Sequence, residues 1–292
     1  MRYLIDHELR LAFATPVREH HCEVRLAPSS SATQQVSVAR LVVEPAAEVH
    51  SFCDYFGNRV HAFDVVAPHT QLIARLHVEV ETLLHNPFAY TVIAPARERD
   101  WIADTLKSQP WLWDYVLHRS NVVPPLTRLA ADRQWPAYDP QHAVLDAVLA
   151  ATEWVADTLA YRSDLAAAGV LAEALQAGSG CCHDLAHLLI AIVRGWGVPA
   201  RFVGGYQDPD YLDEVDEAEP APHGWAEVLI PGAGWRGFDP TTRLLTNDTY
   251  VTAVVGRDAG DTAAYRNTLK GDDAAAVPDV TLRLQRQQDA QQ

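Results

Sequence analysis

Three short blocks of sequence supply, in order along the chain, a thiol, an imidazole and a carboxylate. They are GCCHDLAH at residues 180–187, HGW at 223–225 and GFDPT at 237–241. Nucleophilic acyl transfer needs these groups, because a sulfur attacks, a base takes its proton and an acidic residue holds the base in the right tautomer. No single turn or hairpin spans all three blocks, so the fold has to bring them together. The sequence therefore predicts an enzyme.

The same blocks resemble those of the bacterial transglutaminase-like superfamily, whose core is related to papain-type cysteine peptidases. The matching segments are residues 180–206, 223–241 and the GRD tripeptide at 256–258. The family usually reads Gly-x-Cys-x-Asp-x-Ala-His in the first segment. The resemblance therefore implies that Cys182 is the nucleophile and that Cys181 occupies a variable position.

Within that resemblance, His223 corresponds to the catalytic base and Asp239 to the acidic residue that orients it. The usual His-Ala-Trp of the second block is His-Gly-Trp here, and the Pro and Gly that usually follow GRD are missing at 263–267. Residues 1 to about 85 resemble the β domain that often precedes this core, most clearly at DYFGN in 54–58. The resemblance implies an α+β protein: an N-terminal antiparallel β-sandwich, then a papain-like, transglutaminase-type α+β core with the nucleophile at a helix N-terminus.

The chain of 292 residues is long enough for two domains. We expect an N-terminal β-sandwich domain over 1–86, a helical and Pro-rich connecting region over 87–141, the catalytic core over 142–286 and a disordered tail over 287–292. Alternating polar and apolar residues, separated by Ser, Pro or Gly, indicate the strands of the first domain. These strands are predicted at 2–10, 22–26, 36–43, 60–66 and 75–81.

Local patterns in the second domain place the three groups on defined elements. The helical spacing of apolar residues predicts one helix that begins near His142 and a second from Cys182 to Arg194. Strands are predicted at 200–206, 224–230 and 235–239. The last two strands are joined by a PGAG turn suited to a hairpin, whose antiparallel pairing brings His223 and Asp239 together. Cys182 stands at a helix start.

Charge and hydropathy limit the partners and the location. The net charge of −15 and the pI near 5.2 predict a surface that repels phosphate backbones and anionic lipid, so neither nucleic acid nor a membrane is an expected partner. No apolar run approaches the roughly 18–20 residues that cross a bilayer, and Arg2, Asp6, Glu8 and Arg10 interrupt the apolar stretch of a signal peptide. We expect a cytoplasmic protein, and the oligomeric state stays open.

The chain has four cysteines, two of them adjacent, which is too few and too closely spaced for a disulfide framework. A reducing compartment also suits a working thiol. Cys22 and Cys53 are predicted to be small buried apolar residues without a catalytic role.

The three groups define a mechanism. An ordinary thiol is mostly protonated at pH 7, whereas a helix N-terminus and a protonated imidazole favour the anion. We therefore expect a thiolate of Cys182 paired with an imidazolium of His223, and backbone N–H groups at the helix start as oxyanion donors. The expected substrate is a peptide or amide, the favoured reaction is peptidase or amidase hydrolysis, and no cofactor is expected. Transamidation uses the same residues, and a non-catalytic binding module of this fold is the alternative outside enzymology.

A zinc hydrolase is a rival interpretation, because HDLAH at 183–187 resembles the zinc-binding pattern H-E-x-x-H. Asp184 would replace the usual Glu base, and Cys181 or Cys182 would add a sulfur ligand. Asp is one methylene shorter than Glu, and no third ligand follows at a recognised spacing. The sequence therefore favours the thiol mechanism and assigns Asp184 and His187 to the support of the helix and the neighbouring strands.

An acidic stretch lies between Tyr206 and His223, and a solvated loop is its favoured interpretation. Two functional alternatives stay open: the stretch borders the cleft and selects basic substrates by long-range attraction, or it holds calcium, although its spacing does not match an EF-hand loop. Its members are Asp208, Asp210, Asp213, Glu214, Asp216, Glu217 and Glu219.

Overall fold

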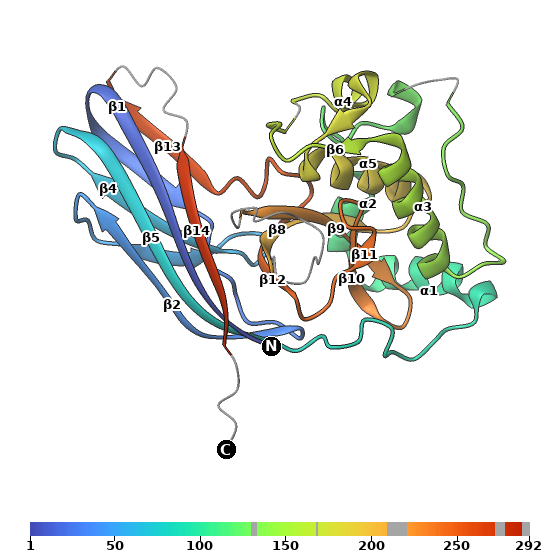
Figure 1. Ribbon diagram of the computed structural model, residues 1–292. Helices are drawn as coiled ribbons and strands as arrows, with labels where there is room; N and C mark the ends of the chain where they lie inside the picture. Colours follow the sequence, from blue (N-terminus) through green and yellow to red (C-terminus); the bar gives the residue numbers. More distant parts are fainter. Residues whose placement is uncertain (130–132, 168, 209–220, 272–277, 288–292) are drawn as a thin grey trace.

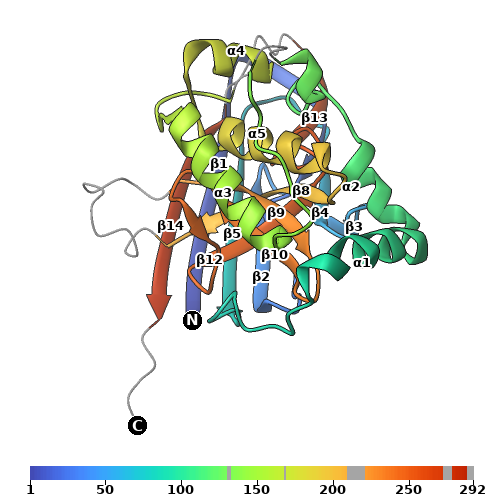
Figure 2. The ribbon, with the colours of Figure 1, turned by 90° about the vertical axis from the view of Figure 1, so that its right-hand side faces the viewer.

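A computed structural model of the protein describes residues 1–129, 133–167, 169–208, 221–271 and 278–287. A large antiparallel sheet forms one side of the molecule, and a smaller sheet with helices packed on it forms the other (Figure 1). Seen from the side, helices α3 and α5 lie in front of the small sheet (Figure 2). The α+β class predicted from the sequence is confirmed.

The large sheet is organised around one very long strand. Its members are β1 (Arg2–Val24), β2 (Gln34–Glu44), β3 (His50–Cys53), β4 (Arg59–Val65), β5 (His69–Thr82), β13 (Tyr265–Lys270) and β14 (Asp279–Gln287). The first half of β1 pairs with β5 and β14, and its second half pairs with β4 and β13. The pairing of β1 with β5 shifts register between Ala12 and Val17. The predicted N-terminal β domain is therefore a curled antiparallel sheet whose two halves share β1.

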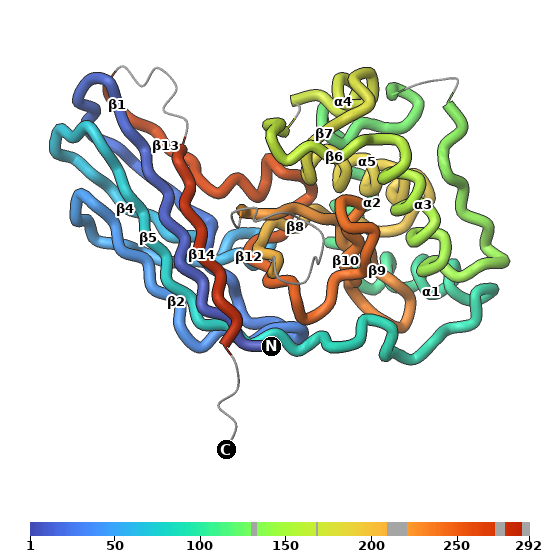
Figure 3. The backbone as a smooth tube through the Cα atoms, viewed as in Figure 1, coloured from blue at the N-terminus to red at the C-terminus, as the bar shows by residue number. Residues whose placement is uncertain are grey.

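The last two strands return to the first domain. The sequence patterns placed residues up to 286 in the core, but β13 and β14 pair antiparallel with β1. The register joins Arg2 to Gln287, so the beginning of β1 and the end of β14 lie side by side (Figure 3). This pairing is a long-range contact that no local pattern encodes. The predicted tail falls almost wholly at 288–292, outside the described residues.

The small sheet separates the helices from the large sheet. Its strands, in spatial order, are β11 (Leu244–Leu245), β10 (Gly234–Asp239), β9 (His223–Ile230), β8 (Ala200–Gln207) and β12 (Tyr250–Gly256). Phe202 and Phe238 pack into the apolar cluster shared with the helices. Tyr206 and Val251 pack into the cluster of the large sheet. Both faces of the small sheet are therefore buried.

The helices cover the outer face of the small sheet. They are α1 (Pro95–Ser108), the 3₁₀ helix η1 (Pro110–Trp113), α2 (Asp114–Leu117), the 3₁₀ helix η2 (Leu126–Arg128), α3 (Val144–Thr158), α4 (Leu171–Ala177) and α5 (Cys182–Gly195). The two-residue strands β6 (Ala160–Tyr161) and β7 (Ser179–Gly180) form a parallel pair just before α5. None of the helices in the described part of the chain is both long and apolar enough to cross a bilayer.

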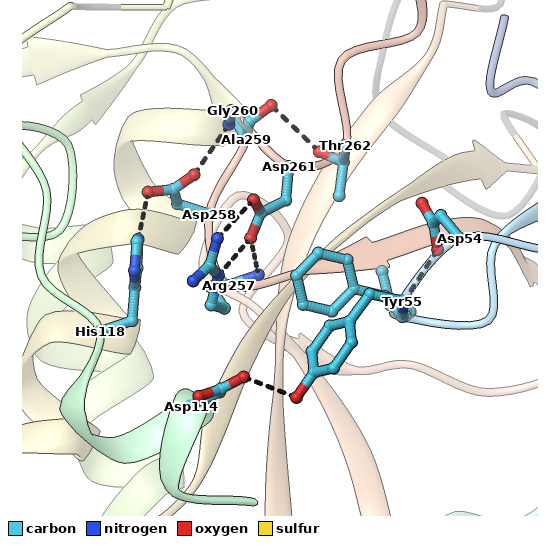
Figure 4. A network of polar contacts seen from close by, with 12 residues as sticks. Asp54, Tyr55, Asp114, His118, Arg257, Asp258, Ala259, Gly260, Asp261 and Thr262 are labelled. Carbon is cyan, nitrogen blue, oxygen red and sulfur yellow. Dashed lines mark hydrogen bonds and ion pairs between the residues drawn. The ribbon is translucent and has the colours of Figure 1, made fainter. Parts of the chain in front are cut away.

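The DYFGN and GRD blocks meet where the large sheet joins the helical side. Asn58 exchanges hydrogen bonds of 2.7 Å with both backbone groups of Val255. Tyr55 donates a hydrogen bond of 2.8 Å to Asp114, and the Arg257 guanidinium lies 5.5 Å from the centre of the Phe56 ring (Figure 4). These contacts fix the domains against each other.

The aspartate of GRD reaches the helical side of the same junction. Asp258 lies 2.8 Å from His118 Nε2 and accepts a hydrogen bond from the Gly260 N–H (Figure 4). Burial acts to raise the pKa of Asp258, but the hydrogen bonds of His118, Ser120 and Gly260 and the charge of His118 together outweigh it and hold this pKa below its usual range. Arg194 of α5 donates to the Arg257 carbonyl at 2.6 Å. The GRD block therefore holds α5 in place at this junction through the contact with Arg194.

Candidate active site

The start of helix α5 is fixed by its own first turn. Cys181 is the N-cap residue, and its side chain accepts the N–H of Asp184 while the Asp184 carboxylate accepts the Cys181 N–H at 2.9 Å. A Cβ on Gly180 would lie 2.7 Å from the Asp184 Cβ, so the chain approaches this turn too closely for a side chain at that position. The reciprocal bonds hold Cys182 at the first position of the helix.

Cys182 is half-buried and the backbone N–H of Gly224 points to its sulfur, whereas Cys181 is buried. The hydrogen bond from Cys182 to the Cys181 sulfur, followed by burial, raises the pKa of Cys182 well above its ordinary value. The same bond lowers the pKa of Cys181. The contact with Cys181 therefore opposes the resting thiolate of Cys182 that the sequence predicts, and a base is needed to take the proton of Cys182.

Tyr161 borders the same site, and the sequence analysis did not single it out. It lies on β6 and is 43 % exposed. Burial is the largest cause that raises its pKa to about 12, followed by the charges that Cys182 and Asp239 carry when they are ionised. Its hydroxyl is therefore protonated at neutral pH and can donate a hydrogen bond at the mouth of the site.

The structure brings His223 and Asp239 together. His223 begins β9, Asp239 ends β10, and the two strands pair antiparallel. His223 Nε2 lies 2.8 Å from Asp239 Oδ2. Because a carboxylate only accepts, Nε2 carries a proton, and in the neutral form of the ring Nδ1 then keeps the lone pair. Cys182 lies beside this hairpin, with its sulfur at the N–H of the residue that follows His223.

Asp239 is completely buried and accepts hydrogen bonds from three further donors. Thr241 N–H reaches Oδ1 at 2.9 Å, and the hydroxyls of Tyr250 and Thr242 reach Oδ2 at 2.9 and 3.1 Å. Burial acts to raise its pKa, but the charge of protonated His223 and the hydrogen bonds from His223, Thr241 and Tyr250 together outweigh burial and lower it. The carboxylate is therefore ionised and held in one orientation. No local motif in the sequence marks Thr242 or Tyr250 for this task.

His187 supports the site from behind rather than lining it. Its side chain is 1 % exposed, and its Nε2 accepts the N–H of Ala259 at 3.1 Å. This bond uses the lone pair that a zinc ion would need at that nitrogen. Asp184 is likewise engaged at the helix start. These contacts fit the structural role predicted for both residues and oppose the zinc interpretation.

Acid should destabilise the protein through His187. Burial lowers its pKa to about 3, against an ordinary value of 6.5, so the unfolded chain binds a proton that the folded protein excludes. Its contribution to stability is complete above pH 6.5 and falls by about 1.4 kcal/mol per pH unit as the pH drops towards 3. We expect urea unfolding at pH 7, 5.5 and 4 to show that the free energy of unfolding falls less steeply with falling pH in His187→Gln than in the wild type. The difference should be about 1.4 kcal/mol per pH unit. His142→Gln, at a histidine that is 71 % exposed, is the control and should keep the wild-type slope.

Comparisons with known proteins identify both parts of the chain. Residues 3–81 match the bacterial transglutaminase-like N-terminal region, and residues 134–240 match the transglutaminase-like superfamily. The chain belongs to the transglutaminase-like superfamily. An uncharacterized protein of Mycobacterium leprae is 29 % identical over 98 % of this chain and 99 % of its own length. An uncharacterized protein of Mycobacterium tuberculosis is 27 % identical over 96 % of this chain and 91 % of its own.

A solved structure shares the fold of this transglutaminase-like protein across nearly its whole length. It is the crystal structure of a candidate cysteine protease from Cytophaga hutchinsonii, with a TM-score of 0.65 and 20 % sequence identity. The match covers 99 % of this chain and 92 % of that one. The arrangement of a β domain followed by a transglutaminase-like core is thus found in a second protein.

The chain departs from the usual family sequence at Gly224, and the structure gives the reason. A Cβ on Gly224 would lie 2.6 Å from His183 Cδ2 and 2.8 Å from Phe202 Cζ. The His183 ring therefore fills the space that the usual alanine would need. The two positions of this transglutaminase-like site are coupled through packing.

We expect Gly224→Ala to lower the free energy of unfolding by about 1–3 kcal/mol, because it adds a methyl group to a filled space. Adding His183→Ala should recover part of that loss, since it removes one of the two crowding rings. Urea unfolding measures both effects. Gly169→Ala is the matched control, because nothing lies within 4 Å of a Cβ there. A Gly224→Ala protein as stable as the Gly169→Ala protein would contradict the packing argument.

Most of the acidic stretch lies outside the described residues, namely Asp210, Asp213, Glu214, Asp216, Glu217 and Glu219. Asp208 is described and is 1 % exposed. Its carboxylate accepts hydrogen bonds from Tyr3 at 3.0 Å and from Arg286 Nε at 2.9 Å. Asp208 therefore ties the core to β1 and β14 and is not part of a solvated loop.

The two cysteines outside the site also differ from each other: Cys22 is buried as predicted, whereas Cys53 is exposed.

Proposed function

We propose that this protein is a cysteine-dependent acyl transferase acting on amide bonds, with Cys182 as nucleophile, His223 as general base and acid, and Asp239 as the residue that orients His223. The observation that carries the proposal is the buried contact of 2.8 Å between His223 Nε2 and Asp239 Oδ2. With Nε2 engaged by Asp239, Nδ1 of His223 is the nitrogen that can accept a proton. It lies on the hairpin that borders the Cys182 sulfur at the start of α5. Proton acceptor and nucleophile thus come from adjacent elements.

The chemistry follows from these positions. As substrate binds, His223 Nδ1 takes the proton of Cys182, and the sulfur forms a bond to the amide carbonyl carbon. The carbonyl oxygen gains negative charge beside the backbone N–H groups of the first turn of α5 and the protonated hydroxyl of Tyr161. The C–N bond then breaks, and His223 returns the proton to the leaving amine. The products are a thioester on Cys182 and a free amine.

Hydrolysis of the thioester completes the reaction that we favour, a peptidase or amidase reaction. Water is the most abundant acceptor, and His223 deprotonates it as it attacks, which releases an acid and regenerates the thiol. Transamidation is the alternative and needs a site that excludes water and admits an amine. A peptide or amide is the substrate in both cases. The cytoplasmic location expected from the sequence is part of this proposal, and a preference for basic substrates stays the alternative that the acidic stretch leaves open.

Alkylation separates the thiol mechanism from a zinc mechanism. Iodoacetamide should abolish hydrolysis of a fluorogenic peptide library, because it caps the sulfur of Cys182. EDTA or 1,10-phenanthroline should leave the rate unchanged, because the proposed site uses no metal. Mass spectrometry of the digested protein should place the carbamidomethyl group on Cys182 when activity is lost. Loss of activity with a chelator, and full activity after alkylation, would favour the zinc alternative.

A further inference from the structure

A cavity of about 170 Å³ lies between the two domains, next to His223 and His183. Its walls come from β1 and β14 of the large sheet and from β8 and β12 of the small sheet. Three larger grooves lie elsewhere, one on the outer face of the large sheet and two beside α1, and none of them is lined by Cys182, His223 or Asp239. The interdomain cavity is therefore the hollow that adjoins the proposed chemistry.

The size and walls of the cavity select an apolar ring. Leu9, Phe202 and Val254 are among the lining residues, and all three are buried in the protein. An engineered apolar cavity of about 150 Å³ in another protein takes one benzene molecule. A cavity of about 170 Å³ thus has room for a single six-membered ring.

Three buried polar atoms of residues that line the cavity lack a hydrogen-bond partner in the described part of the chain: Nε2 of His7, and Nε and Nη1 of Arg25. His7 lines the cavity, is 3 % exposed, and its Nε2 has no hydrogen-bond partner in the described part of the chain. The Tyr206 hydroxyl lies 2.9 Å from the Leu26 carbonyl oxygen and 3.0 Å from His7 Nδ1. Since a carbonyl only accepts, Tyr206 donates to Leu26 and His7 Nδ1 donates to Tyr206. His7 Nε2 therefore carries a lone pair and needs a donor.

The charges at the cavity agree with a neutral occupant. Burial lowers the pKa of His7 to about 4, and it also lowers that of His183, so both rings are neutral at pH 7. Arg25 is the cation among the lining residues. Its Nη2 donates to Glu23 at 2.7 Å and its Nε lies 3.5 Å from Asp54, so two carboxylates balance its charge. His7 Nε2 therefore needs a neutral donor and the unpaired Arg25 N–H groups need an acceptor, and a hydroxyl group can act as both.

We propose that this cavity is a specificity site for a tyrosyl side chain of the substrate next to the reacting amide. The ring fills the apolar space, and the phenolic hydroxyl donates a hydrogen bond to His7 Nε2. The N-terminal domain thereby supplies His7, which binds the hydroxyl of the substrate side chain, while the core supplies the reacting groups. This inference rests on the proposed function, because it takes the bound peptide to be a substrate. The binding that it predicts does not require turnover.

Binding is measured in the Cys182→Ala protein, which holds a peptide without cleaving it. The probes are N-acetylated tripeptide amides with Tyr, Phe or Leu at the centre, and calorimetry gives their dissociation constants. We expect the Tyr peptide to bind about tenfold more tightly than the Phe peptide, because only its hydroxyl satisfies the buried His7 nitrogen. The additional change His7→Leu should bring the Tyr to Phe ratio close to one. Equal affinities without that change, or a Tyr preference that survives it, would overturn the proposal.

A second variant tests the proposal without changing His7, in case the His7→Leu protein does not fold. Ala263 lines the cavity and is half-buried, so Ala263→Phe should fill the space and weaken binding of the Tyr and Phe peptides alike. Ala103→Phe, at an exposed position on α1, is the matched control and should leave binding unchanged. Unaltered binding to the Ala263→Phe protein would also overturn the proposal.

Turnover separates this inference from the proposed function. If the Cys182→Ala protein prefers the Tyr peptide but the wild type cleaves no peptide of the series, the specificity site stands and the proposed function fails. If the wild type cleaves the series with equal kcat/KM for Tyr and Phe, the function stands and the specificity site fails.

Discussion

Replacing Cys182 with alanine is expected to lower kcat by about 10⁴- to 10⁶-fold, because it removes the atom that bonds to the substrate carbonyl. The fold should be retained, since the Cys182 side chain is half-buried and the cap of α5 is made by Cys181 and Asp184. The rate of peptide hydrolysis and a far-ultraviolet circular dichroism spectrum measure both parts of this expectation.

Cys181→Ala is the matched control, because it removes the neighbouring sulfur and keeps the nucleophile. This substitution removes the N-cap acceptor, which should lower the free energy of unfolding by about 1 kcal/mol. Its pH–rate profile should shift to lower pH, because the hydrogen bond to Cys181 is the largest cause that raises the pKa of Cys182. Full activity of Cys182→Ala together with an inactive Cys181→Ala protein would show that the nucleophile is Cys181.

Changing Asp239 to asparagine is expected to lower kcat on the order of 10⁴-fold, as the loss of the orienting carboxylate does in related mechanisms. The amide nitrogen would face His223 Nε2 where a carboxylate oxygen now accepts. The imidazole would then carry its proton on Nδ1, the nitrogen that has to take the proton of Cys182. The loss should appear in kcat with little change in KM, because the affected atom does not touch the substrate.

Two variants divide the role of Asp239 further. Tyr250→Phe and Thr242→Val each remove one of its hydroxyl donors and leave its contact with His223. We expect rates of these proteins to fall by about tenfold at most, because the carboxylate keeps its remaining donors. An Asp239→Asn protein that retains its wild-type kcat, with a normal unfolding transition, would exclude the proposed orienting role.

Elements with strong local patterns were predicted closely. Helix α5 was expected from Cys182 to Arg194 and ends one residue later, at Gly195. The hairpin strands expected at 224–230 and 235–239 each begin one residue earlier in the structure. Periodicity and the PGAG turn are local, so one sequence carries them. The placement of His223 beside Asp239 followed from the same hairpin.

What the sequence did not reveal depends on contacts between distant segments. β1 was expected as two strands, at 2–10 and 22–26, but it is continuous. Pro16 lies where the register with β5 shifts, and a proline is tolerated at such an irregularity. Tyr250 and Thr242 contact Asp239 without belonging to a motif. His7 lines a cavity with His223 although β2 to β5, the helices and β8 separate them in sequence. Tertiary packing decides all of these positions.

The pairing of Arg2 with Gln287 has a consequence for the engineering of this protein. A short linker from Gln287 to Met1 would close the backbone into a ring without disturbing the large sheet. New ends opened at Ala32, which is exposed and lies between β1 and β2, would give a circular permutant. Such a permutant would keep every strand partner of β1 while moving both termini to a different edge of the molecule.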